Sequence, residues 1–355
     1  MGYKILVVNP GSTSTKVALY SEERPLLAET LRHDYGTLRR YEHVADQMEW
    51  RCDMILNSLS SNGYSVGELS AVAGRGGLTK PVEGGIYEVN EAMLNDLRNP
   101  WMEHACNLGG LISHKIACMA GVRAYIADPG VVDEMDEMTH LTGLPQIRRI
   151  SIFHALNQRA IARRHAAECG RRYEDMNLII AHMGGGISVG AHCKGRVVDN
   201  NNALNGDGSF TPERAGTLPA ISLVEMCYSG RYTQSEIRKM LAGKGGITAH
   251  LGTNSVVEVV ERIEAGDEQA RLVLDAMCYN ISKQIGSMAA VLSGDVDGIL
   301  LTGGIAYSDY VVERIVKRCS FIAPVSVYAG EIEMEALADS ALAVLRGEVE
   351  AKRYE

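Results

Sequence analysis

The chain has few basic residues relative to acidic ones, and it has few large aromatic side chains or prolines. Its 355 residues include 35 Lys and Arg against 44 Asp and Glu, which gives a net charge of −9 at pH 7. A general nucleic-acid binder needs a basic face, so we disfavour that class. Only 3 Phe, 2 Trp and 9 Pro accompany 37 Gly. This balance predicts many tight backbone turns, of the kind that approach phosphate groups closely.

The sequence also lacks the usual signatures of zinc sites, disulfides and membrane spans. Its eight cysteines form no C-x-x-C pair, and none has a His at metal-ligand spacing, which argues against a zinc site. The apolar stretch after Lys4 has four residues, too few for a signal peptide. No apolar run approaches the roughly 18 residues of a membrane span. We therefore expect a soluble, cytoplasmic protein that binds neither nucleic acid nor membrane, with buried and reduced thiols.

What the sequence does contain is an alternation of strand-like and helix-like segments, which predicts an α/β protein. Apolar residues recur with a helical period over 40–61, 267–293 and 333–346, and Asp267 is the expected N-cap of the second helix. The expected strands cover residues 4–8, 17–20, 71–73, 124–127, 178–181, 187–191, 298–302 and 325–328.

A strand, a turn of small residues and a returning strand occur twice, first around residues 5–20 and again around 178–190. Because the chain exceeds the roughly 250–300 residues of a single core, we interpret the repeat as two similar halves. The predicted domains are 1–150 and 151–332, with a C-terminal helix of about 333–355 that packs back on the first. Ordinary, unrelated hairpins are the alternative interpretation.

The first of these turns has the composition of a phosphate site. Residues 9–16 read Asn-Pro-Gly-Ser-Thr-Ser-Thr-Lys, which combines backbone N–H groups, hydroxyls and one ammonium. Short donors together with a cation are the groups that hold phosphoryl oxygens. The run is not a P-loop, because G-x-x-x-x-G-K-[ST] does not occur. A solvated, serine-rich turn is the alternative.

Two further glycine turns follow buried strands. Gly184-Gly185-Gly186 is not a dinucleotide fingerprint, because the third glycine of that motif would fall at Val189 and a strand rather than a helix comes next. A strand–glycine–strand hairpin around a phosphate tail remains compatible with the pattern. Gly303-Gly304, after a strand and before a helix, suits close approach of a nucleotide's α-phosphate and sugar.

Several polar side chains beside these turns are candidates for handling charge. Arg75 stands between glycines, on an expected flexible corner, and Arg214 is in a similar setting; a guanidinium can grip a carboxylate or phosphate through two bonds. His154 opens an expected helix, His182 ends a buried strand, and Asp128 ends another strand as a candidate ligand of metal-bound water. The alternatives are surface arginines, structural histidines and a loop-capping carboxylate.

Together these features indicate phosphoryl transfer. Both halves carry phosphate-binding turns, and two arginines, a histidine and carboxylates suited to a metal ion accompany them. The acidic residues within 133–137 are instead expected on a solvated helix face. No evident nucleophile–base pair for acyl-enzyme chemistry is present.

Five motifs, taken in order, resemble the carboxylate kinases of the acetate kinase family, and in particular the branch that uses butyrate. This family lies within the sugar kinase–actin–chaperone ATPase superfamily. The resemblance extends from residue 4 to about 346 and implies a duplicated ribonuclease-H-like fold, with two α/β domains around a nucleotide cleft. The motifs are N-P-G-S-T-S-T-K (9–16), S-I-F-H-A-L-N-Q (151–158), H-M-G-G-G-I-S-V (182–189), F-T-P-E-R-A-G-T-L-P (210–219) and L-T-G-G-I-A (301–306).

The resemblance implies a reversible, Mg²⁺-dependent transfer of a phosphoryl group from ATP to a short-chain fatty acid, giving ADP and an acyl phosphate. It also implies a homo-oligomer of at least two copies. By this resemblance Asn9, Ser12, Ser14 and Lys16 belong to the first phosphate motif, His182, Gly184, Gly185 and Gly186 to the second, and Gly303 and Gly304 to the adenosine motif. Arg75 and Arg214 match the residues that hold the carboxylate and the migrating phosphoryl group, His154 a transition-state stabiliser, His104 a further active-site histidine, and Asp128 and Glu333 the Mg²⁺ positions.

The sequence departs from the acetate kinase pattern in three places. Gly185 stands where acetate kinases carry Asn, and Pro10 replaces their Ala; both changes look like the butyrate branch. A proline–glycine pair is missing before Glu331, so Glu331, Glu333 and Glu335 all remain candidates for one metal position. Acetate or propionate is the alternative substrate, and an actin- or chaperone-like ATPase that acts on a protein partner is the alternative class.

Overall fold

The computed structural model describes residues 2–204 and 206–355, and the chain divides into two compact units. Unit 1 combines the chain up to Val132 with Ile332–Glu355, and unit 2 is Asp133–Glu331. Residues 133–150, expected in the first domain, thus group with the second unit.

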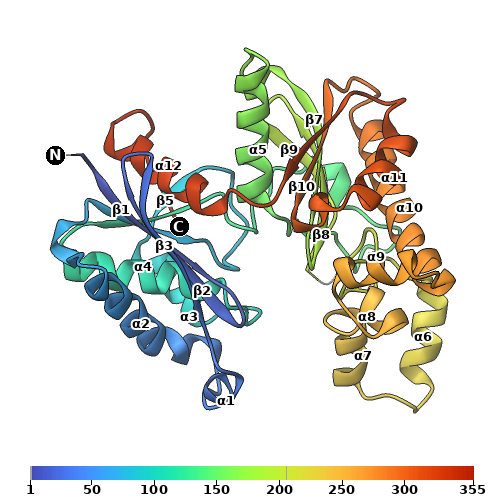
Figure 1. The fold of residues 1–355 in the computed structure, drawn as a ribbon, viewed down its shortest axis with the longest axis horizontal. Coiled ribbons are helices and arrows are strands. Elements are labelled where there is room, and N and C mark those ends of the chain that lie inside the picture. The colour runs from blue at the N-terminus through green and yellow to red at the C-terminus, as the bar shows by residue number, and fades with distance from the viewer. Residues whose placement is uncertain (1, 205) are drawn as a thin grey trace. The chain divides into compact units, whose positions relative to one another are not determined.

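Unit 1 is built on a seven-stranded sheet in the order β12-β5-β6-β4-β1-β2-β3. Figure 1 labels four of these strands, β1, β2, β3 and β5. The first three strands of the chain are antiparallel neighbours, whereas β4 and β6 extend the sheet parallel to β1. The carboxyl ends of β1, β4 and β6 therefore lie at one edge, which carries Asn9, Arg75 and Asp128. The strands are β1 Lys4–Pro10, β2 Ser14–Ser21, β3 Arg24–Arg32, β4 Ala71–Arg75, β5 Ile86–Glu88, β6 Arg123–Ala127 and β12 Lys352–Arg353.

Unit 2 has a five-stranded sheet in the order β11-β10-β7-β8-β9. Here too three successive antiparallel strands are followed by two that run parallel to the first of them. Both first strands, β1 and β7, are runs of Ile, Leu, Val and Ala buried on both faces, as central strands require. The strands are β7 Asn177–Met183, β8 Ile187–Cys193, β9 Arg196–Asn200, β10 Gly298–Gly303 and β11 Val325–Ala329.

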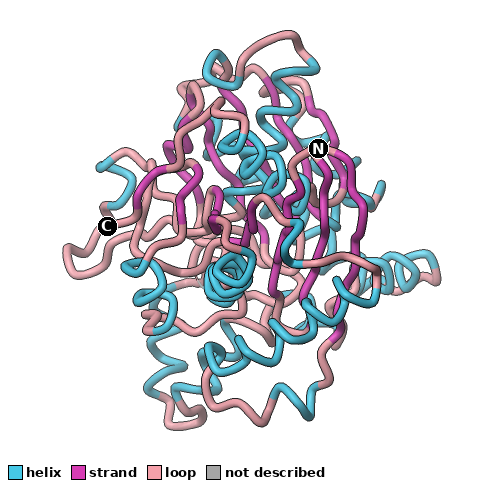
Figure 2. Tube along the Cα trace, turned by 90° about the vertical axis from the view of Figure 1, so that its left-hand side faces the viewer, coloured by secondary structure: helices cyan, strands magenta, loops and turns pink. Residues whose placement is uncertain are grey.

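The shared order and directions of five strands in each unit confirm the duplicated α/β fold expected from the sequence. Figure 1 shows α2 and α4 on one side of the unit 1 sheet and α12 on the other. In unit 2, α5 and α10 cover opposite sides of the sheet, and Figure 2 distinguishes helices (cyan) from strands (magenta). The helices are α1 Tyr35–Leu38, α2 Met48–Ser61, α3 Glu91–Arg98, α4 Asn107–Ala120, α5 Ala155–Glu168, α6 Ala220–Tyr228, α7 Gln234–Leu241, α8 Gly246–Leu251, α9 Val256–Glu264, α10 Glu268–Val291, α11 Asp309–Cys319 and α12 Glu333–Leu345.

Two helices each pack on the other unit's sheet rather than on the sheet whose strands precede them in the sequence. Helix α5, which follows β6 along the chain, packs on β7 and β10 of unit 2. Helix α12, which follows β11, packs on β1 and β4 of unit 1. Unit 1 is therefore assembled from two segments that are distant in the sequence.

Two expectations about local environment were wrong. The residues around Glu134 form no helix face: they lie in an extended segment whose Asp136 N–H donates to Val198 O of β9 (3.2 Å). Glu134 is half-buried, with 11% of its side chain exposed, and pairs with Arg159 Nη1 at 2.9 Å. The eight thiols are free, as expected, but three of them are exposed rather than buried, namely Cys118, Cys169 and Cys227.

Among the described residues, no helix combines the length and apolar character needed to cross a bilayer.

Candidate active site

In unit 1, the turn between β1 and β2 presents the polar groups of the first phosphate motif. The turn is closed by the Gly11 N–H, which donates to Ser14 O at 2.7 Å. Ser12 and Lys16 are exposed and Ser14 is half-buried, so two hydroxyls and one ammonium can reach a ligand. Asn9 is only 5% exposed and belongs instead to a buried polar cluster around the carboxylate of Glu333.

That cluster joins Asn9, Arg75 and Glu333. Glu333 is the first residue of α12 and is 4% exposed. Its Oε2 accepts a hydrogen bond from Asn9 Nδ2 at 2.8 Å and lies 3.3 Å from Arg75 Nη1. A buried carboxylate needs such partners, because desolvation strongly disfavours an isolated charge. The Arg75 guanidinium is thereby fixed in direction while a third of its side chain stays exposed.

The glycines around Arg75 do not form the flexible corner that we expected. Arg75 is the last residue of β4, and neither neighbouring glycine has a positive φ. A Cβ on Gly74 would collide with the backbone of Gly109 in α4, and a Cβ on Gly109 would collide with Arg75 O. Gly74 is required because α4 and β4 approach each other closely, and a Cβ on Gly76 would collide with Pro129, so Arg75 sits on rigid backbone.

Asp128 follows β6 in a conformation that is unusual for a non-glycine residue, with φ of 38°. The conformation is held by two hydrogen bonds, from Gly85 N to Asp128 Oδ1 (2.8 Å) and from Asp128 N to Gly85 O (2.9 Å). One carboxylate oxygen therefore caps the Gly85 loop. Backbone strain of this kind persists where surrounding contacts impose it, often at functional sites.

His104 lies just before α4. Its Nδ1 is 2.9 Å from the Sγ of Cys106, which precedes the helix. Burial raises the pKa of the Cys106 thiol to about 11, although the nearby charge of Arg75 opposes the shift. Cys106 is thus a neutral thiol at pH 7, and its contact orients the imidazole of His104.

In unit 2, two histidines lie face to face at the end of β7. His182 is in the strand and His154 precedes α5; their rings are 3.9 Å apart and inclined by 12°. Parallel stacking at this distance disfavours simultaneous protonation, because two imidazolium charges would repel each other. We therefore expect at least one of the two rings to be neutral.

The hydrogen bonds of His154 select one tautomer of its neutral ring. Ser188 Oγ accepts from Gln158 Nε2 (2.9 Å) and lies 2.8 Å from His154 Nδ1. The His154 backbone N–H also donates to this oxygen at 3.3 Å. Because the two N–H donors occupy both lone pairs of Ser188 Oγ, its bond to His154 Nδ1 must use the hydroxyl proton. His154 then carries its own proton on Nε2, where it can donate to an oxyanion.

The same logic applies to His182. Asn157 Nδ2, an amide donor, lies 2.9 Å from His182 Nδ1, and it also donates to Thr302 Oγ1 at 3.1 Å. His182 Nε2 is 3.7 Å from the carboxylate of Glu331. In both histidines, Nδ1 thus accepts a hydrogen bond from a protein group, and Nε2 is the nitrogen that donates.

A cavity of about 860 Å³, lined entirely by residues of unit 2, lies next to the turn that follows β7. Its lining includes the two glycine turns of the sequence, through Gly184, Gly185 and Gly304. Further lining comes from Tyr307 and Tyr310, whose flat rings suit a planar heterocycle. The cavity is large enough for a nucleoside with its phosphates.

Arg214 is folded onto the loop next to the second glycine turn. Its Nη1 donates to Ala203 O, and burial lowers the pKa of the guanidinium. Thr211 Oγ1 accepts from the Arg214 N–H at 3.0 Å and donates to Gly185 O at 2.6 Å. Thr211 therefore links the loop that carries Arg214 to the glycine turn at Gly185 through hydrogen bonds.

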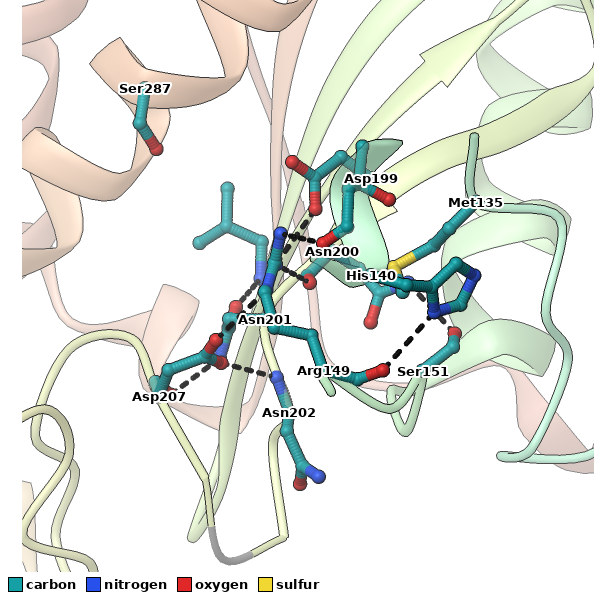
Figure 3. A network of polar contacts seen from close by, with 12 residues as sticks. Met135, His140, Arg149, Ser151, Asp199, Asn200, Asn201, Asn202, Asp207 and Ser287 are labelled. Carbon is teal, nitrogen blue, oxygen red and sulfur yellow. Dashed lines mark hydrogen bonds and ion pairs between the residues drawn. The ribbon is translucent and has the colours of Figure 1, made fainter. Parts of the chain in front are cut away.

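A polar network around Arg149 anchors the start of this loop (Figure 3). Arg149 Nη2 donates to Asp199 Oδ1 at 2.8 Å, and its Nε donates to Asp207 Oδ2 at 3.3 Å. Although burial acts in the opposite direction, the two carboxylates raise the pKa of Arg149. Asn201 accepts from Val189 N (2.7 Å) and donates to Asp207 O (3.2 Å), which connects β8 to the loop.

The residues of unit 1 fit a hard divalent cation only in part. Asp128 and Glu333 offer carboxylate oxygens, which Mg²⁺ prefers, but each is already engaged by protein donors. No group of three or more His, Cys, Asp or Glu side chains within 2–204 and 206–355 could hold a metal ion. This donor set suits Mg²⁺ that is bound through one or two carboxylates, water and substrate phosphates.

Comparison with known proteins decides the family. The model of the acetokinase family matches residues 139–329. Butyrate kinase 2 of Clostridium acetobutylicum is 52% identical over 355 residues and is covered over 100% of both chains. The chain belongs to the acetokinase family.

Solved structures of acetokinase relatives share the fold. The acetate kinase of Porphyromonas gingivalis has a TM-score of 0.77 at 21% identity, over 96% of this chain and 100% of that chain. A propionate kinase of Francisella tularensis has a TM-score of 0.74 at 18% identity, over 95% and 98%.

The structure places the predicted site residues of this acetokinase-family chain in two sets. Unit 1 carries the first phosphate turn, Arg75, His104, Asp128 and Glu333; unit 2 carries the histidine pair, both glycine turns and Arg214. The sequence analysis missed the supporting residues Asn157, Gln158 and Ser188. They were inside two quoted motifs, and Asn157 and Gln158 follow His154 by three and four residues, on the same face of α5.

Gly186→Ala is expected to lower kcat by about 10–100-fold, since small displacements of a catalytic group have effects of this size. A Cβ at this position would collide with the Arg214 guanidinium, which must then move. Steady-state kinetics measure the effect. Gly143→Ala is the matched control, because a Cβ there meets nothing within 4 Å. Wild-type kcat in Gly186→Ala would show that the position of Arg214 is unimportant.

Proposed function

We propose that the chain is a butyrate kinase, which reversibly transfers the γ-phosphoryl group of ATP to butanoate and forms butanoyl phosphate and ADP. The observation that carries the proposal is the full-length 52% identity to a butyrate kinase. Acetate or propionate is the alternative substrate, but the solved acetate and propionate kinases are at most 21% identical and support the fold alone.

The carboxylate that accepts the phosphoryl group needs no chemical activation. A carboxylic acid is already ionised at pH 7, so no general base is needed. The difficulty is to bring two anions together and to stabilise charge on the transferring phosphoryl group. In the proposal, the unit 2 cavity holds the nucleotide, with Gly184, Gly185 and Gly304 against its phosphates and sugar.

The remaining side chains stabilise charge. Arg75 and Arg214 would bind the carboxylate and the equatorial oxygens of the phosphoryl group, and His154 would donate from Nε2. His104 would contact the substrate, and His182 would support His154 through the stacked rings.

Asp128 and Glu333 would hold Mg²⁺ together with the nucleotide, and the ion would neutralise phosphate charge. Among the three glutamates considered, burial and the bonds to Asn9 and Arg75 favour Glu333. Glu335 is exposed, and Glu331 lies near His182.

The test is ATP-dependent acyl-hydroxamate formation with Mg²⁺ against acetate, propionate, butyrate, isobutyrate and valerate. We expect the highest kcat/KM with a four-carbon acid. A maximum at two or three carbons would reassign the substrate within the carboxylate kinases. ATP hydrolysis without any hydroxamate would support the partner-driven ATPase instead.

We also propose that the chain forms a homo-oligomer of at least two copies. Helix α6 supports this, because none of its residues is buried although it is rich in apolar side chains. Ile221, Val224 and Tyr228 are 72%, 51% and 88% exposed. Sedimentation equilibrium should give at least a dimer, and Ile221→Glu should shift it toward monomer. A monomeric wild type would contradict the proposal.

A further inference from the structure

Arg51 of α2 is a buried cation directly behind the first phosphate turn. Its side chain is among the largest that are fully buried, with 1% of the residue exposed. No carboxylate of the described residues lies within ion-pair distance of it. Its side-chain partner is the neutral Gln47, just before α2, whose Oε1 accepts from Nη2 at 2.7 Å and from Nε at 3.1 Å. An isolated buried charge is costly, so its retention needs a physical reason.

The other hydrogen bonds of Arg51 go to the turn. Nη1 donates to Gly11 O at 2.8 Å and to Thr15 Oγ1 at 3.1 Å. Longer contacts reach Ser14 O (3.4 Å) from Nη1 and Ser12 O (3.5 Å) from Nη2. One guanidinium thus gathers the carbonyl oxygens of three turn residues on one side of the backbone.

This arrangement determines where the N–H groups of the turn point. In a trans peptide, the C=O and the following N–H point in opposite directions. Because the carbonyls of Gly11 and Ser12 face Arg51, the N–H groups of Ser12 and Thr13 face away from it. No described residue accepts from either N–H. Successive N–H groups on one side of a turn form a concave anion site.

Arg51 also sets the charge of this region. Burial lowers its pKa to about 10, so it stays charged at pH 7. The neighbouring His33 lies 2.8 Å from Thr15 Oγ1 through Nε2, and burial together with Arg51 lowers its pKa to about 4. His33 is therefore neutral at pH 7, and Arg51 alone supplies the positive charge behind the turn.

We infer that Arg51 is a positioning residue for phosphate: it holds the β1–β2 turn in its anion-binding shape and supplies an uncompensated charge whose counter-charge is a phosphate of the ligand. This inference rests on the proposed function of the turn. It explains both the missing carboxylate partner and the convergence of carbonyl groups on one side chain.

Two substitutions test the charge and the geometry separately. Gln47→Glu gives Arg51 a carboxylate partner in place of a neutral amide of the same shape. Arg51→Lys keeps the charge, but a single ammonium cannot contact Gln47 and the turn together. Arg123→Lys, at an exposed ion pair with Glu88, is the matched control. Inorganic tripolyphosphate is the probe, and calorimetry measures its affinity for the full chain.

In both variants we expect the Kd for tripolyphosphate and the KM for ATP to rise by about 10-fold, as loss of one charged interaction allows. Gln47→Glu should do so with an unchanged or higher Tm. If Arg51 had only a structural role, Gln47→Glu would bind tripolyphosphate as tightly as the wild type does, with the same unchanged or higher Tm. Wild-type Kd values in both variants would overturn the inference. This conclusion would hold even if Arg51→Lys lowered the Tm.

The two proposals fail in distinguishable ways. If the wild type binds tripolyphosphate but phosphorylates no carboxylate, the proposed function is wrong and the role of Arg51 is still measurable. If carboxylates are phosphorylated but Gln47→Glu and Arg51→Lys bind and turn over as the wild type does, the role of Arg51 is wrong.

Discussion

Arg75→Ala is expected to lower kcat with butyrate by about 100–1,000-fold, the usual cost of removing one donor that acts on transition-state charge. The KM for ATP should change much less, because the role proposed for this guanidinium is to bind the carboxylate and the migrating phosphoryl group, whose charge develops in the transition state, rather than the bound nucleotide. Steady-state kinetics with each substrate varied in turn would measure both quantities.

Stability must be separated from catalysis in this experiment. Removal of Arg75 leaves the buried carboxylate of Glu333 without its cation, and such losses can cost about 3–5 kcal/mol. Arg75→Lys retains a charge near Glu333 but not the two-pronged guanidinium, so it should be stable and still slow. Arg123→Ala, at an exposed ion pair, controls for loss of an arginine. Unchanged kcat in folded Arg75→Ala would remove this residue from the mechanism.

His154→Ala should lower kcat by about 100-fold or more, and Ser188→Ala should have about a tenth of that effect. The first change removes the Nε2 donor, whereas the second removes only the hydroxyl that keeps the proton on Nε2. Ser188→Thr retains the hydroxyl and should recover most of the activity.

A spectroscopic measurement distinguishes tautomer control from a packing effect. In the wild type, ¹⁵N shifts of the His154 ring should identify Nδ1 as the unprotonated nitrogen at neutral pH. In Ser188→Ala the two tautomers should mix. A wild-type ring protonated on Nδ1 would contradict the hydrogen-bond argument, whatever the kinetics.

The sequence predicted the positions of the turns better than the behaviour of single side chains. The glycine turns after β7 and β10, at Gly184 and Gly303, were placed correctly, because buried Ile, Leu and Val runs mark central strands without reference to the rest of the fold. The expected N-cap at Asp267 was also confirmed, since a cap depends on its own residue and the next turn.

Predictions were wrong where the environment of a residue is determined by a segment that is distant in the sequence. The glycines beside Arg75 suggested a flexible corner, but Gly74 is required by the close approach of Gly109 in α4 and Gly76 by that of Pro129. The same limitation applies to Arg51. Helical periodicity identified the buried face of α2 from its apolar residues alone. The role of Arg51 on that face could not be predicted in this way, because it depends on the β1–β2 turn that the side chain contacts.

The exchange of α5 and α12 has a consequence for how the protein is made. Unit 2 is one continuous stretch, Asp133–Glu331, and can fold once that stretch has left the ribosome. Unit 1 lacks α12, with Glu333, and the buried Tyr354 until Ile332–Glu355 has also emerged. Unit 1 therefore begins to be synthesised first but completes its fold after unit 2 has been made, and Glu333 can pair with Arg75 only at that later stage.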